Sequence, residues 1–219
     1  PATQWFDANG WKIFDFQQQT WEAYLSGKSG LVNAPTGSGK TYSLIIPVLL
    51  EALQKNEHKG LQLIWITPIR ALAKEICISS VRAIAELGLD WRVEIRSGDT
   101  TTTQRKKQWS HPPQILITTP ESIHVMLATK DNHLFFKGLK AVVVDEWHEL
   151  VGSKRGVQTE LLLARFKFLF PALRVWGISA TIGNMEEAIA AGEDVRIIPV
   201  LYEPYLPCKG VEIVSGGKV

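Results

Sequence analysis

LVNAPTGSGKT, residues 31 to 41, is the stretch that decides the fold. A short apolar segment runs into a glycine-containing loop, which then opens a stretch with helical character. Gly37 and Gly39 allow the backbone to curl so that its N–H groups point inward at phosphate oxygens. A strand, such a loop and a helix, in this order, are the context that a phosphate-binding loop requires. The alternative is an ordinary Gly/Ser loop between a strand and a helix.

A lysine and a threonine stand where such a loop uses them. Lys40 would reach the β- and γ-phosphates of a nucleotide, and the Thr41 hydroxyl would bind Mg²⁺. The helix that starts near Lys40 adds the positive end of its dipole. The predicted nucleotide loop consists of Pro35, Thr36, Gly37, Ser38, Gly39, Lys40 and Thr41.

Strand-length apolar runs alternate with helix-like stretches along most of the chain. The runs are nearly continuous, as expected for strands that are covered on both faces. They lie at 30–33, 61–67, 92–96, 114–118, 140–145 and 174–179. The helix-like stretches lie at 15–26, 40–55, 70–88, 120–129 and 157–170. This alternation predicts an α/β domain with a mostly parallel sheet and helices on both faces.

The valine-rich segment 140–145 ends in two adjacent acids, Asp145 and Glu146. Ligands of open α/β sheets bind at the carboxyl ends of the strands. Asp145 would hold Mg²⁺ there through water, and Glu146 would orient and deprotonate an attacking water. Two acids at a buried strand end would be costly without a cation beside them. The alternative is an N-cap aspartate before a solvated helix, which the nearby phosphate loop makes the weaker interpretation.

Composition narrows the class of protein. The 219 residues suffice for one large domain or two small ones, and 45% hydrophobic with 21% charged residues is ordinary for a soluble globular protein. The net charge of +2 neither demands nor excludes a nucleic-acid partner. Cys77 and Cys208 suggest no disulfide framework and no Cys/His metal site, which favours a reducing cytoplasm. The sequence contains no run of 18 apolar residues, so it predicts no membrane span.

Several motifs in a fixed order resemble those of superfamily 2 helicases. The segment Asp-Glu-x-His at 145–148 resembles motif II, and QQQTWEAYLSGKSG (17–30) resembles the Q-motif. Further matches are TPIRALAKE (67–75) to motif Ia, TTPESI (118–123) to motif Ib and SAT (179–181) to motif III. The phosphate loop has Ala34 where glycine is usual, a form common in helicases. The segments 96–100 and 145–156 resemble a narrower group, the Lhr-like helicases, especially bacterial DEXH helicases encoded beside a DNA ligase.

This resemblance implies the first RecA-like domain of an ATP-dependent DNA helicase, with ATP and Mg²⁺ as cofactors. It implies that His148 senses the γ-phosphate and couples hydrolysis to the motif III residues Ser179, Ala180 and Thr181. A histidine in this position, taken alone, is more often a satisfied polar group than a switch.

The Q-motif resemblance implies that Gln17 reads the adenine, since a glutamine amide can pair with adenine N6 and N7. Trp11 is our candidate for stacking on the base, because of its position relative to Gln17. The alternative for both residues is an ordinary amphipathic helix with a core tryptophan.

Residues near the starts of two predicted helices suit a nucleic-acid backbone. Thr67-Pro68 and Thr119-Pro120 follow apolar strands, and helix N-termini at one edge of a sheet can hold phosphates. The predicted strand-binding set is Thr67, Pro68, Arg70, Gly98, Thr100, Thr118, Thr119 and Pro120. Routine helix capping would use many of the same residues. The basic run 105–107 is equally consistent with a solvated face and with a DNA contact.

The expected organisation is one helicase domain over residues 1–190 followed by an irregular tail or linker over 191–219 with one or two short strands. We expect the second RecA-like domain, absent from these residues, to lie elsewhere in the same full-length chain. The expected partner is single-stranded nucleic acid, DNA rather than RNA, with a DNA repair ligase system as a further partner and no membrane. The expected location is the bacterial cytoplasm, at the nucleoid. The rival functions are an RNA helicase domain, another P-loop enzyme such as a kinase or GTPase, and a nucleic-acid-binding module with weak ATPase activity.

Overall fold

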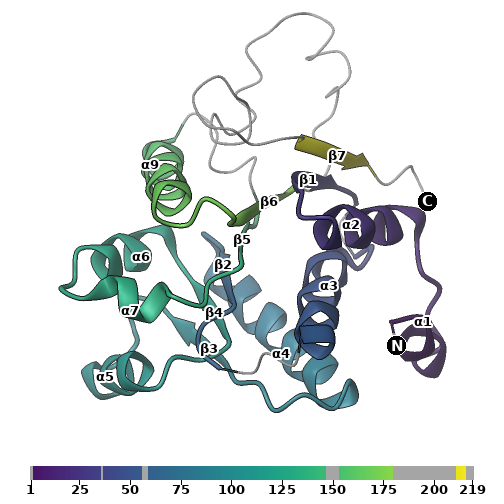
Figure 1. Cartoon of the computed structure of the whole chain (residues 1–219), viewed down its shortest axis with the longest axis horizontal. Helices are drawn as coiled ribbons and strands as arrows, with labels where there is room; N and C mark the ends of the chain where they lie inside the picture. Colours follow the sequence, from purple (N-terminus) through teal and green to yellow (C-terminus); the bar gives the residue numbers. More distant parts are fainter. Residues whose placement is uncertain (1, 36, 56–58, 147–152, 180–210, 216–219) are drawn as a thin grey trace, which may run out of the picture.

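The computed structural model describes residues 2–35, 37–55, 59–146, 153–179 and 211–215. Within them lies a seven-stranded sheet in which every pairing is parallel, in the order β3-β4-β2-β5-β6-β1-β7 (Figure 1). The strands are β1 (Ser29–Asn33), β2 (Leu63–Ile66), β3 (Val93–Arg96), β4 (Ile115–Thr118), β5 (Ala141–Val144), β6 (Arg174–Ser179) and β7 (Val211–Ser215). Because all strands run the same way, their carboxyl ends meet at one edge.

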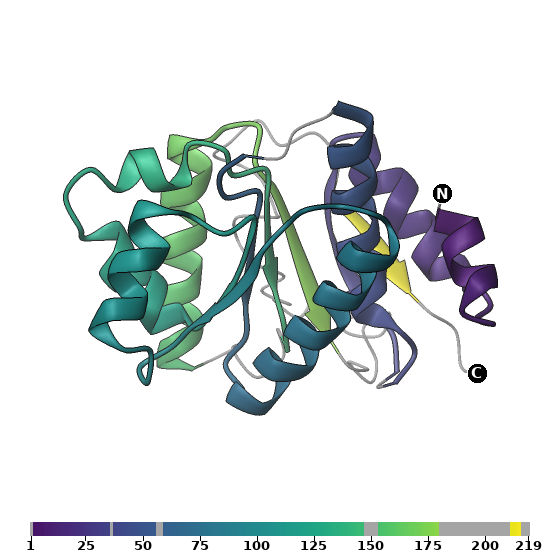
Figure 2. The same cartoon turned by 90° about the horizontal axis from the view of Figure 1, so that it is seen from below.

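Helices cover both faces of this sheet (Figure 2). One face carries α1 (Ala2–Ala8), α2 (Asp15–Leu25), α3 (Lys40–Lys55) and α4 (Arg70–Glu86). The other face carries α5 (Thr102–Ser110), α6 (Pro120–Leu127), α7 (Asn132–Phe136) and α9 (Lys154–Leu169). None of the helices in the described ranges is both long and apolar enough to cross a membrane.

The central strands alternate their side chains between two hydrophobic clusters. In β2, Leu63 and Trp65 join the cluster under α2, α3 and α4, whereas Ile64 and Ile66 join the one under α6, α7 and α9. All four of these side chains are fully buried. Continuous apolar strands therefore arise because each face of the sheet has its own helical cover.

The predicted α/β fold with a mostly parallel sheet is confirmed. Each of the six predicted strands and five predicted helices is present, with ends that differ by up to three residues. The sequence patterns did not indicate α1, α5 or α7, which are short or polar. Within the predicted tail, β7 joins the sheet as a parallel neighbour of β1, so this part of 191–219 adds a strand to the domain.

Candidate functional site

The loop between β1 and α3 lies at the carboxyl edge of the sheet. Gly37 and Gly39 both adopt positive φ angles, 80° and 79°, a region that side-chain-bearing residues rarely enter. At the start of the loop, the Ala34 amide donates to the Ser179 carbonyl over 3.3 Å. The loop then ends at Lys40, the first residue of α3. This is the strand–loop–helix arrangement that the sequence predicted.

Lys40 points back into its own loop. Its Nζ donates a 2.6 Å hydrogen bond to the Ala34 carbonyl. Partial burial lowers the pKa of the Lys40 ammonium, and the charges of Glu146 and Asp145 oppose that shift. The acids and the lysine therefore share one electrostatic environment, although they lie far apart in the sequence.

Gln17 is buried against the phosphate loop. Its Nε2 donates to the Gly39 carbonyl over 3.1 Å, and its Oε1 accepts from the Phe14 amide over 3.0 Å. A Cβ on residue 39 would lie only 2.8 Å from Gln17 Nε2. The amide thus contacts the loop backbone itself, and its predicted pairing with adenine would use the remaining N–H and lone pair.

Trp11 lies in an aromatic cluster with Trp5, Phe6 and Tyr42. The Tyr42 ring is tilted by 38° at 5.3 Å, and the Arg82 guanidinium lies 4.7 Å from the centre of the Trp11 ring. These contacts support the core-tryptophan interpretation of Trp11. Among the aromatic residues of this cluster, it is Tyr42 that lines the cavity beside the phosphate loop.

Asp145 follows β5 and is 7% exposed. Trp65 Nε1 donates to Asp145 Oδ2 over 3.2 Å, and the Glu146 amide donates to Asp145 Oδ1 over 2.9 Å. Burial raises the pKa of Asp145 to about 6, and the Trp65 hydrogen bond only partly opposes this shift. Glu146 has a φ of 48°, a left-handed conformation that is uncommon for residues other than glycine. Such strain is characteristic of functional positions.

One cavity of about 280 Å³ brings the predicted nucleotide residues together. Its lining includes Gly37, Gly39, Lys40, Thr41, Asp145 and Glu146. Sequence reasoning missed Glu75 and Ser79, which line the same cavity from α4, and Trp65, which orients Asp145. An apolar strand gives no signal that one of its tryptophans will donate a hydrogen bond to a neighbouring strand end.

The residues around this cavity fit a Mg²⁺–nucleotide. The loop amides around Gly37 and Gly39 suit phosphate oxygens, and a hydroxyl and a carboxylate are the oxygen ligands that Mg²⁺ prefers. A buried carboxylate whose pKa is raised by burial is also the group that a cation would stabilise. Among the described residues, no group of three or more His, Cys, Asp or Glu side chains could hold a metal ion. Thr41 and Asp145, which line the cavity, would hold Mg²⁺ together with water and phosphates.

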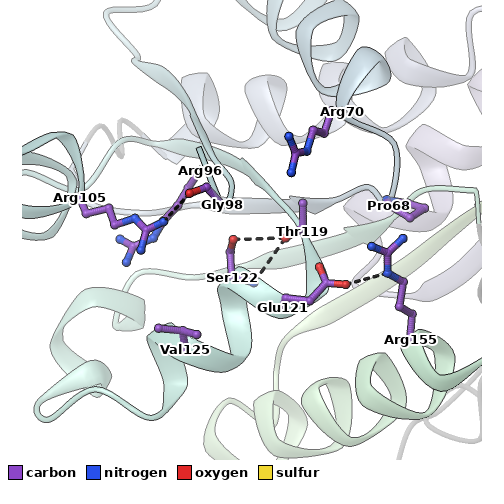
Figure 3. A pocket seen from close by; sticks show the side chains of 10 residues that line it. All are labelled: Pro68, Arg70, Arg96, Gly98, Arg105, Thr119, Glu121, Ser122, Val125 and Arg155. Atoms are coloured by element: carbon purple, nitrogen blue, oxygen red, sulfur yellow. Dashed lines mark hydrogen bonds and ion pairs between the residues drawn. The ribbon is translucent and has the colours of Figure 1, made fainter. Parts of the chain in front are cut away.

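A second cavity, of about 360 Å³, lies at the same edge, where β2, β3 and β4 end (Figure 3). Its lining includes Pro68, Arg70, Gly98 and Thr119 from the predicted strand-binding set. Arg96, Arg105, Glu121, Ser122, Val125 and Arg155 complete it. We call it the strand cavity. The sequence pattern leaves the role of Arg105 open and gives no indication of Arg96 or Arg155.

The threonines of this set act as helix caps and turn caps. Thr119 Oγ1 accepts from the Ser122 amide over 3.4 Å at the start of α6, where Pro120 is buried in the first turn. Thr67 Oγ1 accepts from the Ile69 amide over 3.4 Å, before α4. Thr100 Oγ1 accepts from the Ser97 amide over 2.9 Å and so closes the turn around Gly98.

Thr118 differs from these caps, because its buried Oγ1 has no hydrogen-bond partner among the described residues. It lines an adjoining cavity of about 670 Å³ together with Thr67, Arg70, Arg96 and Thr119. Arg70 is exposed and pairs with Asp99 over 2.5 Å.

Four predicted site residues, Thr36, His148, Ala180 and Thr181, lie outside the described residues. Of the predicted coupling residues, Ser179 is described: it is fully buried, it pairs in register with Asn33, and its carbonyl accepts from Ala34. The end of β6 therefore contacts the start of the phosphate loop.

The parallel sheet and the loop between β1 and α3 define the chain as a RecA-like P-loop domain. A comparison with family models is consistent with this class and narrows it, since the DEAD/DEAH box helicase model matches residues 14–188. The chain belongs to the DEAD/DEAH box helicase family.

Named relatives and one solved structure point to the same branch of the family. The chain is 32% identical to the Lhr helicase/uracil glycosylase of Escherichia coli, over 98% of this chain and 15% of that protein. It is 31% identical to the ATP-dependent helicase Lhr-Core of Methanocaldococcus jannaschii, over 98% of this chain and 28% of that protein. The chain thus spans less than a third of these relatives.

The structure of Mycobacterium smegmatis helicase Lhr bound to ssDNA and AMP-PNP superposes with a TM-score of 0.75 at 30% identity. The match covers 98% of this chain and 27% of that one. The predicted resemblance to Lhr-like helicases is confirmed at the level of sequence and fold.

Proposed function

We propose that this domain binds ATP–Mg²⁺ and a single DNA strand and forms half of the motor of an Lhr-type DNA helicase. The observation that carries the proposal is the cavity that Gly37, Gly39, Lys40, Thr41, Asp145 and Glu146 share. Loop glycines, a lysine and two acids at the carboxyl edge of a parallel sheet are the parts that phosphoryl transfer from a nucleotide requires. The similarity to an Lhr helicase bound to ssDNA and AMP-PNP supports the choice of ligands.

Each residue has a defined task in this proposal. Lys40 leaves the Ala34 carbonyl and binds the β- and γ-phosphates, and the loop amides contact the same oxygens. Thr41 and Asp145 would hold Mg²⁺, which would neutralise charge on the phosphates. Glu146 orients and deprotonates the attacking water. Gln17 holds Gly39 in place and recognises adenine, and Ser179 connects the loop to β6.

The DNA strand would run across the ends of β2, β3 and β4. The starts of α4 and α6, with Pro68 and Thr119, offer backbone amides, and Arg70 adds charge. The remaining members of the set, Thr67, Gly98, Thr100, Thr118 and Pro120, shape these turns. Contacts of this kind read the phosphates and not the bases.

The wider setting extends the proposal. We place the domain in the bacterial cytoplasm at the nucleoid, with a second RecA-like domain elsewhere in the full-length chain completing the nucleotide site. A role in DNA repair beside a DNA ligase is part of the same proposal and rests on the resemblance of segments 96–100 and 145–156 to ligase-associated helicases.

Fluorescence anisotropy with unrelated single strands, measured over a salt series, tests the DNA half of this proposal. Arg70→Ala should weaken binding by a similar factor on every sequence and reduce the salt dependence by about one unit of slope. Arg165→Ala, a charge change at a position in α9 that lines neither the nucleotide cavity nor the strand cavity, is the control. Unchanged affinity and slope for Arg70→Ala, or a changed preference for one base, would refute the phosphate contact.

A further inference from the structure

The strand cavity is unusually rich in arginine. Four arginines and one acid line it (Figure 3). Arg155 pairs with Glu121 over 2.7 Å, and Arg70 pairs with Asp99. Arg96 and Arg105 form no ion pair with any residue in the described ranges. The cavity thus contains two cations that the described part of the protein leaves without a counter-charge.

Arg96 is the more unusual of the two. It is the last residue of β3, it is only 7% exposed, and its buried Nη1 has no hydrogen-bond partner among the described residues. A guanidinium stays charged in proteins, and a buried charge without partners is costly. Arg96 nevertheless lines the strand cavity, so an anion bound there would offset the cost of its uncompensated charge.

Arg105 carries a second positive charge near Arg96 and increases the free-energy cost of the buried Arg96 charge. Its Nη2 donates to the Ser97 carbonyl over 3.2 Å and to the Gly98 carbonyl over 3.0 Å, while its Nε is buried without a partner in the described ranges. The pKa of Arg96 is lowered by burial and further by the charge of Arg105. Two like charges held together by a strand end and a helix favour an anion between or beside them.

We infer that Arg96 and Arg105 form a preorganised oxyanion site that binds one phosphate of the DNA strand. A phosphate matches the chemistry, because its oxygens accept the paired N–H groups of a guanidinium fork. The neighbouring Thr119 and Ser122, at the start of α6, would contact the same strand. This inference rests on the proposed function for its source of phosphate, since free inorganic phosphate offers the same oxygens.

The competing explanation is structural: Arg105 holds the turn around Gly98, and Arg96 merely fills the wall. The two explanations differ in their consequences for stability. If Arg96 serves ligand binding, Arg96→Gln should keep or raise the melting temperature of the ligand-free chain, because a buried unpaired charge is removed. A purely structural arginine would lower the melting temperature when replaced, without a selective effect on phosphates.

The decisive experiment uses the 219-residue chain and oligonucleotides with a single methylphosphonate moved along the strand. In the wild-type protein, one position should weaken binding by about tenfold, the loss expected for a charge-assisted contact. Arg96→Gln and Arg105→Gln should each weaken binding of the unmodified strand similarly and abolish the effect of that one methylphosphonate. Arg165→Gln, an exposed neutralisation in α9 that lines neither the nucleotide cavity nor the strand cavity, is the control and should leave the profile unchanged.

A second arm separates this inference from the proposed function. Because the phosphate loop also offers a site for inorganic phosphate, this arm uses a Lys40→Ala background. Inorganic phosphate should raise the melting temperature of Lys40→Ala and not of Lys40→Ala combined with Arg96→Gln. Arg96→Lys, which keeps the charge without the fork, replaces Arg96→Gln if that variant fails to fold. If the chain binds no single strand, the proposed function fails, and the phosphate arm alone decides the oxyanion site. An Arg96→Gln variant with a wild-type methylphosphonate profile, or an undiminished response to phosphate when Arg96→Gln is added to Lys40→Ala, would overturn the inference.

Discussion

Asp145, which follows β5 and lines the nucleotide cavity, is a buried acid. It accepts hydrogen bonds from Trp65 and from the Glu146 amide, and burial raises its pKa to about 6. An acid raised from its ordinary pKa of 3.8 binds its proton more tightly in the folded state than in the unfolded chain. The contribution of Asp145 to the stability of the folded protein therefore falls as pH rises from about 4 to about 6, and the loss is complete above that window.

We predict that Asp145→Asn removes this part of the pH dependence. Asparagine resembles the protonated acid, so it does not acquire a charge between pH 4 and pH 6. A pKa shift of about two units corresponds to roughly 3 kcal/mol. Relative to the wild type, the free energy of unfolding of Asp145→Asn should therefore rise by up to that amount between pH 4 and pH 6. Denaturant unfolding on either side of the window, at about pH 4 and about pH 7, measures it, and parallel curves for the two proteins would contradict the assignment.

Gly39 is constrained in two separate ways at the scale of the loop and its helix. Its φ is positive, and a Cβ at this position would lie 2.8 Å from Gln17 Nε2. Gly27, between α2 and β1, has a similar φ of 85° but open space around it. Comparing the two positions separates backbone strain from the contact with Gln17.

We predict that Gly27→Ala loses about 1 to 2 kcal/mol of stability, because it forces an L-residue into the left-handed region. Gly39→Ala should lose more than that, because its new methyl group also meets the buried Gln17 side chain. Only Gly39→Ala should also lose nucleotide affinity, by about tenfold or more, because the new methyl group displaces the Gln17 amide from the loop. Chemical denaturation and titration with a fluorescent ATP analogue give the two values. Wild-type affinity in Gly39→Ala would exclude Gln17 as a positioning residue for the loop.

The elements also explain which parts of the fold could be predicted from the sequence. Buried parallel strands such as β2 and β5 are continuous apolar runs, and the loop glycines mark where a strand gives way to a helix. The helix α5 was missed because its sequence, TTQRKKQWS, is polar almost throughout. Arg96 was missed as a site residue because its importance comes from burial and from its neighbour Arg105, and neither appears in a linear pattern.

At the scale of the whole molecule, the nucleotide cavity and the strand cavity lie at different strands along one edge of the sheet. The ends of β1, β5 and β6 surround the nucleotide cavity, and the ends of β2, β3 and β4 surround the strand cavity. The helix α4 reaches both, since Arg70 lines the strand cavity and Leu72, Ile76 and Ser79 line the nucleotide cavity. The two cavities therefore share α4 as a common wall.

This arrangement leads to a prediction about the chain taken alone. One wall of the nucleotide cavity is built here, and the chain spans less than a third of its Lhr relatives. In related phosphoryl transfer an arginine finger contributes about 10³ to 10⁵ in rate, and we propose that a second RecA-like domain supplies it. The 219-residue chain should thus bind ATP–Mg²⁺ weakly and hydrolyse it far more slowly than one turnover per second. Two variants control the measurement. Glu146→Gln should keep ATP binding because the amide retains size and hydrogen bonding, whereas Lys40→Ala should lose contact with the phosphates.

One outcome would contradict this prediction. Steady-state turnover near one per second, from pure protein and abolished in Glu146→Gln, would show that the described wall suffices without a second domain.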